Sequence, residues 1–210
     1  MAENEILIGV VPVGNLGGQF LDEIMIGIKE VLQLTFSENH DKKTICCKPI
    51  PPRPAPIPAS AYQSILGKYN IEPFFDIAIE LKAKADAKLS YKGRSVTKVL
   101  VITNVPLFSY TNNCSVFGEA QTDGNSAVVS LHQIEKNAGA REIKERTIKE
   151  CIHELGHTFG LRHCMDKKCV MSQSSDMYDV DSKSKYFCDG CRRMLRSIEF
   201  SKDYRTWKGF

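Results

Sequence analysis

The sequence predicts an α/β (or α+β) fold in which helices pack against a β-sheet. Two observations indicate this class. Short apolar runs typical of strands alternate along the chain with longer segments of helical periodicity. In addition, 42% of the 210 residues are hydrophobic, which suffices for an ordinary core. The length suits one domain, which we divide into an N-terminal sheet and helix subdomain, about 1–160, and a C-terminal subdomain, about 161–210.

The first half of the chain begins with an apolar run, Ile6–Val11, that predicts a buried strand. Leu21–Thr35 has apolar residues at helical spacing and predicts a helix, and Thr44–Lys48 predicts a short strand. The segment Pro49–Pro58 predicts an extended surface loop, because its prolines fit neither helix interiors nor central strands. Ile71–Asp86 predicts a second helix, with a proline in its first turn, where a missing N–H costs nothing.

The second half continues the alternation. Lys98–Thr103 is rich in branched residues and predicts a strand, as do Ser115–Gln121 and Ala127–Leu131. Ala140–Phe159 contains strong helix formers, no proline and an apolar face at helical spacing, and therefore predicts a helix. A last helix is expected near Gly190–Phe200.

A histidine motif, H-E-x-x-H-x-x-G-x-x-H, occupies the end of this long helix. His153 and His157 lie about 40° apart around a helix and about 6 Å along it, so both imidazoles reach one metal ion. His163 can reach the same metal ion only if the helix ends before it. Gly160 allows this, because glycine readily adopts the left-handed conformation that ends many helices. A histidine pair alone also fits a solvated helix face, but Gly160 and His163 at these offsets favour a metal site.

Three histidine ligands leave a fourth position open, as in catalytic zinc sites. Water in this position would have its pKa lowered from 15.7 toward roughly 7. Glu154 is beside a ligand but is not needed as one, so we predict that it is the general base that takes a proton from this water and passes it to the leaving amine.

Four cysteines follow, Cys164, Cys169, Cys188 and Cys191, with the spacings C-x4-C and C-x2-C. Paired cysteines of this kind are typical of a structural zinc site, and two disulfides are the alternative. The acidic start of the chain lacks the features of a secretory signal, which predicts a cytoplasmic protein. Because disulfides are rare in a reducing compartment, we expect a second, structural zinc.

The histidine motif, together with the four cysteines and Met171, resembles the archaemetzincins, zinc metallopeptidases of the metzincin clan. The resemblance covers roughly residues 95–195. It implies a metzincin-like mixed twisted sheet, an active-site helix and a zinc-stabilised C-terminal segment, with Met171 packed in a turn below the metal and Gly160 as structural support. It also makes Ser115–Gln121 a candidate edge strand to which a peptide could add, although an ordinary edge is equally compatible. Gln173 stands where many metzincins carry a tyrosine, so the resemblance identifies no residue that assists the oxyanion.

These observations predict a zinc-dependent peptidase with two zinc ions per chain and a peptide or protein substrate. The alternative is a zinc-stabilised module that binds peptides or a partner with little or no hydrolysis, as the missing tyrosine would permit. Arg192, Arg193 and Arg196 could suggest nucleic-acid binding, but a solvated helix face is the better interpretation. The net charge of +3, from 28 basic and 25 acidic residues, is too balanced to favour nucleic acid or a membrane surface, and we expect a monomer.

Overall fold

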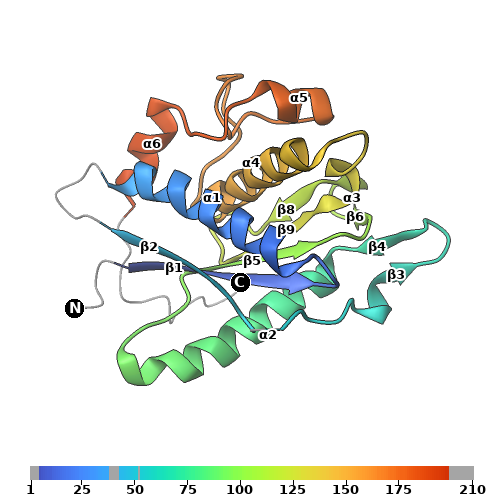
Figure 1. The fold of residues 1–210 in the computed structure, drawn as a ribbon, viewed down its shortest axis with the longest axis horizontal. Helices are drawn as coiled ribbons and strands as arrows, with labels where there is room; N and C mark the ends of the chain where they lie inside the picture. The colour runs from blue at the N-terminus through green and yellow to red at the C-terminus, as the bar shows by residue number, and fades with distance from the viewer. Residues whose placement is uncertain (1–4, 38–42, 52, 199–210) are drawn as a thin grey trace.

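The computed structural model describes residues 5–37, 43–51 and 53–198. Its centre is a five-stranded sheet in the order β2-β1-β5-β9-β8, parallel except for β8, which runs antiparallel to β9 (Figure 1). The strands are β1 (Glu5–Val13), β2 (Thr44–Pro49), β5 (Lys98–Thr103), β8 (Gly118–Ala120) and β9 (Ser126–Ser130). The sheet is therefore mixed, as the resemblance implies.

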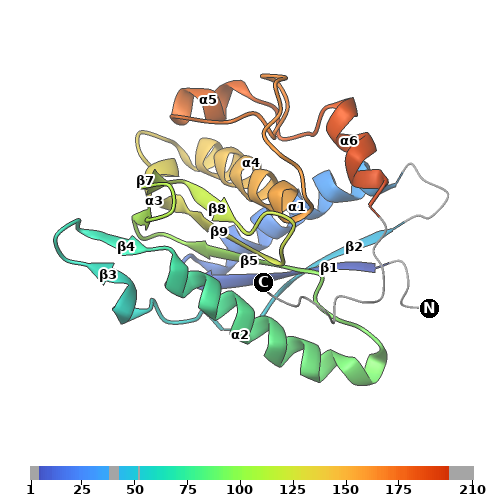
Figure 2. The same cartoon turned by 180° about the vertical axis from the view of Figure 1, so that it is seen from behind.

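Helices cover both faces of this sheet. In Figures 1 and 2, α1 (Gly18–Phe36) and α4 (Ala140–Thr158) lie on one face and α2 (Glu72–Leu89) lies on the other. The alternation of side chains along β1 produces the two cores. Ile8 and its alternate neighbours pack with α1 and α4, whereas Leu7 and its alternate neighbours pack with α2.

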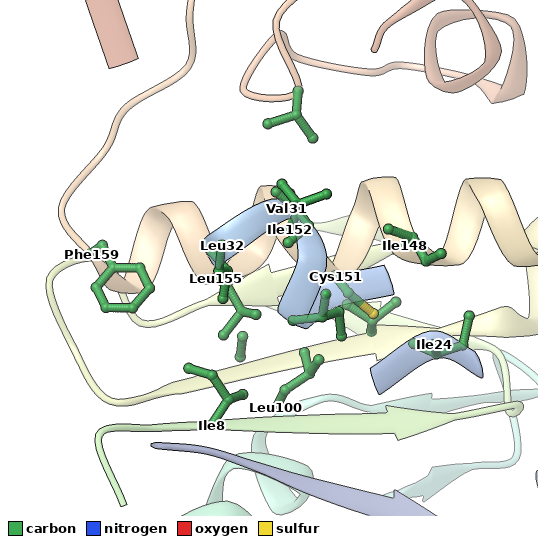
Figure 3. Close-up of a cluster of buried hydrophobic side chains, with 14 of the residues drawn as sticks. Ile8, Ile24, Val31, Leu32, Leu100, Ile148, Cys151, Ile152, Leu155 and Phe159 are labelled. Carbon is green, nitrogen blue, oxygen red and sulfur yellow. The ribbon is translucent and has the colours of Figure 1, made fainter. Parts of the chain in front are cut away.

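The larger core lies between the sheet and the pair α1 and α4 (Figure 3). In this view Ile8 and Leu100 of the sheet face Leu32 of α1 and Leu155 of α4. All four side chains are completely buried. The apolar face of α4 therefore anchors the helix firmly to the sheet, which leaves its histidine face free for other contacts.

A smaller sheet in the order β3-β4-β6-β7 was not expected from the sequence. Its strands are β3 (Tyr62–Gln63), β4 (Lys68–Asn70), β6 (Leu107–Ser109) and β7 (Cys114–Val116). The prediction of one continuous strand over Ser115–Gln121 is wrong, because the segment forms two strands. The first, β7, pairs with β6 as far as Val116, and the second, β8, pairs with β9 from Gly118. Phe117 lies between the two sheets, and its carbonyl accepts a hydrogen bond from the Ser130 amide at 2.7 Å.

The other expected elements are confirmed to within a few residues. Pro49, the first residue of the predicted proline-rich loop, still belongs to β2, and the other described residues of the loop form no strand or helix beyond a single bridge from Ala55 to Val13. Short helical segments complete the chain: η1 (Ala59–Ala61), η2 (Ser90–Lys92), α3 (Leu131–Ile134), α5 (Met177–Ser182) and α6 (Asp189–Arg196). The last expected helix thus ends at Arg196, and residues 199 and 200 of that prediction lie outside the described residues. None of the described helices has an apolar stretch long enough to cross a membrane.

Helices α5 and α6 and the chain between them lie over α4 and α1 on the side away from the sheet (Figure 2). Phe187, Cys191 and Leu195 from this segment belong to the same buried cluster as α1 and α4. Arg196 donates a hydrogen bond from Nε to the carbonyl of Thr35 at 2.8 Å, which joins α6 to α1. The division into two subdomains at about residue 160 stays a prediction.

Lys98, at the start of β5, is a buried lysine beside the end of α4. Only 1% of its surface is exposed. Its Nζ donates hydrogen bonds to the carbonyl of Gly124 at 2.6 Å and to that of Thr158 at 2.7 Å. Because the last carbonyls of a helix have no partner within the helix, Lys98 satisfies one of them next to the histidine motif.

We expect the contribution of Lys98 to stability to rise with pH. Burial lowers its pKa from 10.5 to about 8, and Asp123 opposes this shift. Between these two values the unfolded chain binds more protons than the folded one, so stability increases as pH increases. The free energy of unfolding should gain about 1 kcal/mol between pH 8 and pH 9 from this residue. Denaturant unfolding of the wild type and of Lys98→Met at both pH values measures the difference, and parallel pH dependences would contradict the expectation.

Candidate metal centres

The long helix α4 presents two histidines to one point. His153 and His157 are one turn apart, and their Nε2 atoms are separated by 3.2 Å. The helix ends as expected: Gly160 has φ +84°, and the Leu161 amide donates to the Gly156 carbonyl at 3.0 Å. A residue with a side chain would be strained at this φ, so glycine allows the turn that carries the chain back.

His163 follows this turn and completes a cluster. Its ring centre lies 5.3 Å from that of His153 and 4.9 Å from that of His157. One ligand nitrogen from each of the three rings lies within 4.8 Å of the others. A tetrahedral zinc with bonds of about 2.0–2.1 Å separates its nitrogen ligands by about 3.3 Å. The 3.2 Å spacing of the first pair therefore fits zinc, and His163 is close enough to complete the set.

Hydrogen bonds orient the two helical rings. His153 Nδ1 lies 2.8 Å from the carbonyl oxygen of Val170, and His157 Nδ1 lies 2.7 Å from that of Leu161. A carbonyl oxygen can only accept a hydrogen bond, so each Nδ1 must carry the ring proton. Each Nε2 therefore has a lone pair free to bind a metal. Burial lowers the pKa of both rings and, with less burial, that of His163. All three imidazoles are thus favoured in the neutral form that binds metals.

Glu154 is buried between α4 and the edge strand β8. It is 6% exposed, and a Cβ added to Gly118 would lie 2.9 Å from Glu154 Cγ and 3.1 Å from its Oε1. Glycine at position 118 therefore leaves the space that this carboxylate occupies. Burial raises the pKa of Glu154 well above its ordinary value; Glu150 and Glu119 raise it further, and Lys183 lowers it. A carboxyl group with a raised pKa is suited to accept and release a proton near neutral pH.

Met171 packs against the histidine helix, as expected. It is completely buried, and a Cβ added to Gly156 would lie only 2.3 Å from its sulfur atom. Gly156 lies between the two helical histidines in sequence, so the methionine sits directly against the metal-binding turn of α4. Gln173 is exposed, and 77% of the surface of Tyr178 is exposed.

The four cysteines form a second cluster in the C-terminal segment. The sulfur atoms of Cys164 and Cys188 are 3.8 Å apart, as are those of Cys169 and Cys191, and all four lie within 4.8 Å of one another. Disulfide sulfurs would be about 2.05 Å apart, whereas a tetrahedral zinc with bonds of about 2.3 Å holds its sulfurs about 3.8 Å apart. The spacing therefore fits a four-thiolate zinc site and excludes the disulfide alternative in this structure.

The two clusters are linked by the chain and by hydrogen bonds. His163 and Cys164 are neighbours in sequence, and the amide of Cys164 donates to the carbonyl of Met171 at 2.8 Å. The Val170 amide donates to the Tyr186 carbonyl at 3.0 Å, which pairs the two arms of the cysteine segment. Val170, whose carbonyl orients His153, is therefore held in place by the part of the segment that carries Cys188 and Cys191.

The structure also places residues that the sequence patterns did not identify. Glu150 lies one turn before Glu154 on α4, and this spacing could have indicated a shared face. Lys183 and Gly118 carry no such signal, because only the fold brings them to α4. Two of the three arginines of α6 have partners within the protein: Arg192 pairs with Asp189, and Arg196 donates a hydrogen bond to the carbonyl of Thr35.

Comparison with known proteins identifies the family. The sequence model of peptidase family M54 matches residues 55–197. The archaemetzincin of Methanopyrus kandleri is 37% identical over 142 residues, which cover 68% of this chain and 74% of that protein. The archaemetzincin of Haloarcula marismortui is 31% identical over 194 residues, which cover 89% and 97%.

Solved structures agree with this result. The crystal structure of the M. kandleri archaemetzincin superposes with a TM-score of 0.70 at 28% identity, covering 92% of this chain and 94% of that one. A zinc-dependent peptidase from Methanocorpusculum labreanum has the same fold, with a TM-score of 0.69 at 21% identity over 90% of this chain and 99% of that one. The predicted fold class is confirmed. The chain belongs to the archaemetzincins, peptidase family M54, and is a zinc-dependent metallopeptidase of the metzincin type.

Proposed function

We propose that His153, His157 and His163 bind the catalytic zinc of this peptidase and that Glu154 is its general base. The observation that carries the proposal is the cluster of three ligand nitrogens within 4.8 Å of one another, two from α4 and one from the segment after it, beside a buried glutamate of the same helix. The set has nitrogen ligands only and one open position, as in catalytic zinc sites.

His153, His157 and His163 would hold the zinc ion, which would supply Lewis-acid chemistry by making a water molecule more acidic and polarising a peptide carbonyl. Glu154 takes a proton from the attacking water on a carboxylate oxygen and delivers it to the leaving amine nitrogen. Burial raises the pKa of Glu154, which brings the carboxylate closer to the pH at which both transfers are efficient. Gln173 is exposed, and the proposal assigns no side chain to the oxyanion.

The free edge of β8 is the proposed binding place of the peptide. β8 is the last strand of the five-stranded sheet, and Gly118 in it lies against Glu154. A peptide that adds to this edge as an extended strand would run past the carboxylate, with its main chain hydrogen-bonded to the strand. An ordinary edge strand is the alternative, and the cleavage pattern of long peptides distinguishes them, because strand addition requires several residues on at least one side of the cleaved bond.

Cys164, Cys169, Cys188 and Cys191 are proposed to bind a second, structural zinc. The 3.8 Å sulfur spacings support four thiolate ligands and leave no open position. None of the eight cysteines forms a disulfide, which supports the cytoplasm as the compartment, because it keeps cysteines reduced. We also propose that the protein is a monomer and that its substrates are peptides or proteins.

A peptide-library digest read by mass spectrometry tests this function, with the Glu154→Ala protein as the blank. We expect cleavage products from the wild type that a chelator and a hydroxamate suppress, and two zinc atoms per chain by elemental analysis. Tight binding of library peptides without products over long incubation would instead favour the binding-module alternative. One zinc atom per chain would contradict the assignment of one of the two sites.

A further inference from the structure

A buried lysine, Lys183, reaches the active-site helix from the C-terminal segment. It follows directly after α5, and its side chain is 1% exposed. Its Nζ lies 2.9 Å from Oε1 of Glu150, whose side chain is 4% exposed, and 3.4 Å from the carbonyl oxygen of Ser172, to which it donates. Removing two charges from water offsets much of their attraction, so stability alone is a weak explanation for an ion pair this deeply buried.

Both partners of Lys183 adjoin the proposed catalytic centre. Glu150 lies on α4, one turn before His153 and Glu154. Ser172 follows Met171, whose sulfur packs against the same helix at Gly156. One lysine therefore contacts the active-site helix on one side and, on the other, the segment Val170, Met171 and Ser172, which we call the methionine turn.

The methionine turn also orients a proposed ligand. The carbonyl of Val170, two residues before Ser172, lies 2.8 Å from Nδ1 of His153. This contact determines which nitrogen of the ring faces the metal and how the ring is turned. A shift of the turn away from α4 would move the Val170 carbonyl and release the His153 ring.

We propose that Lys183 is a positioning residue for the catalytic centre: it ties the methionine turn to α4 through Ser172 and Glu150, and so holds the Val170 carbonyl against His153. This inference rests on the proposed role of His153 as a zinc ligand. A ligand must be held within about 0.5 Å of its productive position, and residues outside the ligand set supply that precision.

The electrostatic effect of Lys183 on the catalytic groups is consistent with this positioning role. Burial is the largest influence on the pKa of Glu154 and of each of the three histidines, but the positive charge of Lys183 acts on all four groups. Lys183 therefore lies close to the whole centre and opposes the negative charges of Glu119 and Glu150 around the base.

Lys149 provides a matched control. It is the residue before Glu150 on α4, is 8% exposed, and donates from Nζ to the carbonyls of Val180 at 2.9 Å and Asp181 at 3.0 Å. It thus holds the same helix α5 that precedes Lys183, and none of its hydrogen bonds within the described part of the chain reaches the methionine turn. Loss of Lys149 should weaken the docking of α5 without moving the Val170 carbonyl.

Three variants of the full zinc-loaded chain test the proposal: Lys183→Met, Lys149→Met and the double variant Glu150→Met/Lys183→Met. We expect Lys183→Met to lower kcat tenfold or more with KM within about twofold, and Lys149→Met to leave both near the wild-type values. The double variant leaves no unpaired buried charge, so its melting temperature should recover toward that of the wild type. Its kcat should stay low, because the tether to Ser172 is still missing.

A second measurement does not depend on cleavage. The proton on His153 Nδ1 is shielded from solvent by its bond to Val170 and should give a slowly exchanging downfield signal in the proton NMR spectrum. We expect that signal to broaden or vanish in both variants that lack Lys183 and to persist in Lys149→Met. A wild type without peptidase activity would refute the proposed function and leave this readout intact.

Two results would overturn the proposal. Full recovery of kcat in the double variant would show that the lysine only neutralises Glu150. An unchanged His153 signal in Lys183→Met would show that the Val170 carbonyl is held without it.

Discussion

Replacing Glu154 with glutamine is expected to lower kcat/KM for a cleaved peptide by about 10²- to 10⁴-fold, the range that a positioned acid or base contributes. Glutamine keeps the shape of the side chain in the space beside Gly118 but cannot take a proton from water. Both zinc ions should stay bound, because Glu154 is not a ligand in the proposed set. Steady-state kinetics and elemental analysis of the same preparation measure the two quantities together.

Glu145 supplies the control for this experiment. It is an exposed glutamate of the same helix and lies more than two turns before Glu154. Glu145→Gln should therefore keep the wild-type rate. If Glu154→Gln also kept that rate with both zinc ions present, another group would have to be the base.

Replacing Cys169 with serine is expected to remove one zinc ion and to unfold the segment from Cys164 to Cys191. Structural zinc contributes about 10–16 kcal/mol to the folding of small zinc peptides, which is comparable to the total stability of a domain, about 5–15 kcal/mol. Cys169 is 1% exposed, and its sulfur also accepts a hydrogen bond from the Cys188 amide at 3.3 Å. Burial raises its pKa to about 11, so a nearby cation is needed to form its thiolate at neutral pH.

Activity should be lost with the second zinc, although Cys169 is not part of the catalytic set. Val170, the next residue, orients His153, and its amide is bound to Tyr186 in the other arm of the segment. Limited proteolysis should cut the variant within the cysteine segment, and the melting temperature should fall by more than 10 °C, since about 1 kcal/mol corresponds to roughly 2–4 °C in a chain of this size. Cys114→Ser, at an exposed cysteine of β7, should keep both zinc ions and full activity. A Cys169→Ser protein that retained two zinc ions would contradict the four-cysteine site.

The sequence predicted the parts of this molecule that depend on local patterns. The continuous apolar runs appear as the buried strands β1, β5 and β9, and the segments with helical periodicity appear as the helices α1, α2 and α4. The histidine motif and its turn at Gly160 also follow local rules, since the spacing along one helix and one positive φ set the geometry.

The parts that were missed depend on the tertiary structure. Strands β3 and β4 contain two and three residues, and β4 is stabilised by pairing with the distant strand β6, which no periodicity reveals. The break at Phe117 arises because the chain changes partner from β6 to β9, although the sequence continues as one extended run. Lys183 is 33 residues from Glu150, and a lysine in a polar stretch gives no indication of burial.

If a peptide adds to β8, as proposed, the short length of this strand limits the number of main-chain hydrogen bonds that it can form with the peptide. Its residues pair with β9 so that Phe117, Glu119 and Gln121 are directed to that strand, which leaves the amides and carbonyls of Gly118 and Ala120 facing outward. A bound chain would then gain at most four main-chain hydrogen bonds from this strand. So few hydrogen bonds suit short oligopeptides and unfolded chain ends, which are already extended. They supply too little binding free energy to unfold a compact protein.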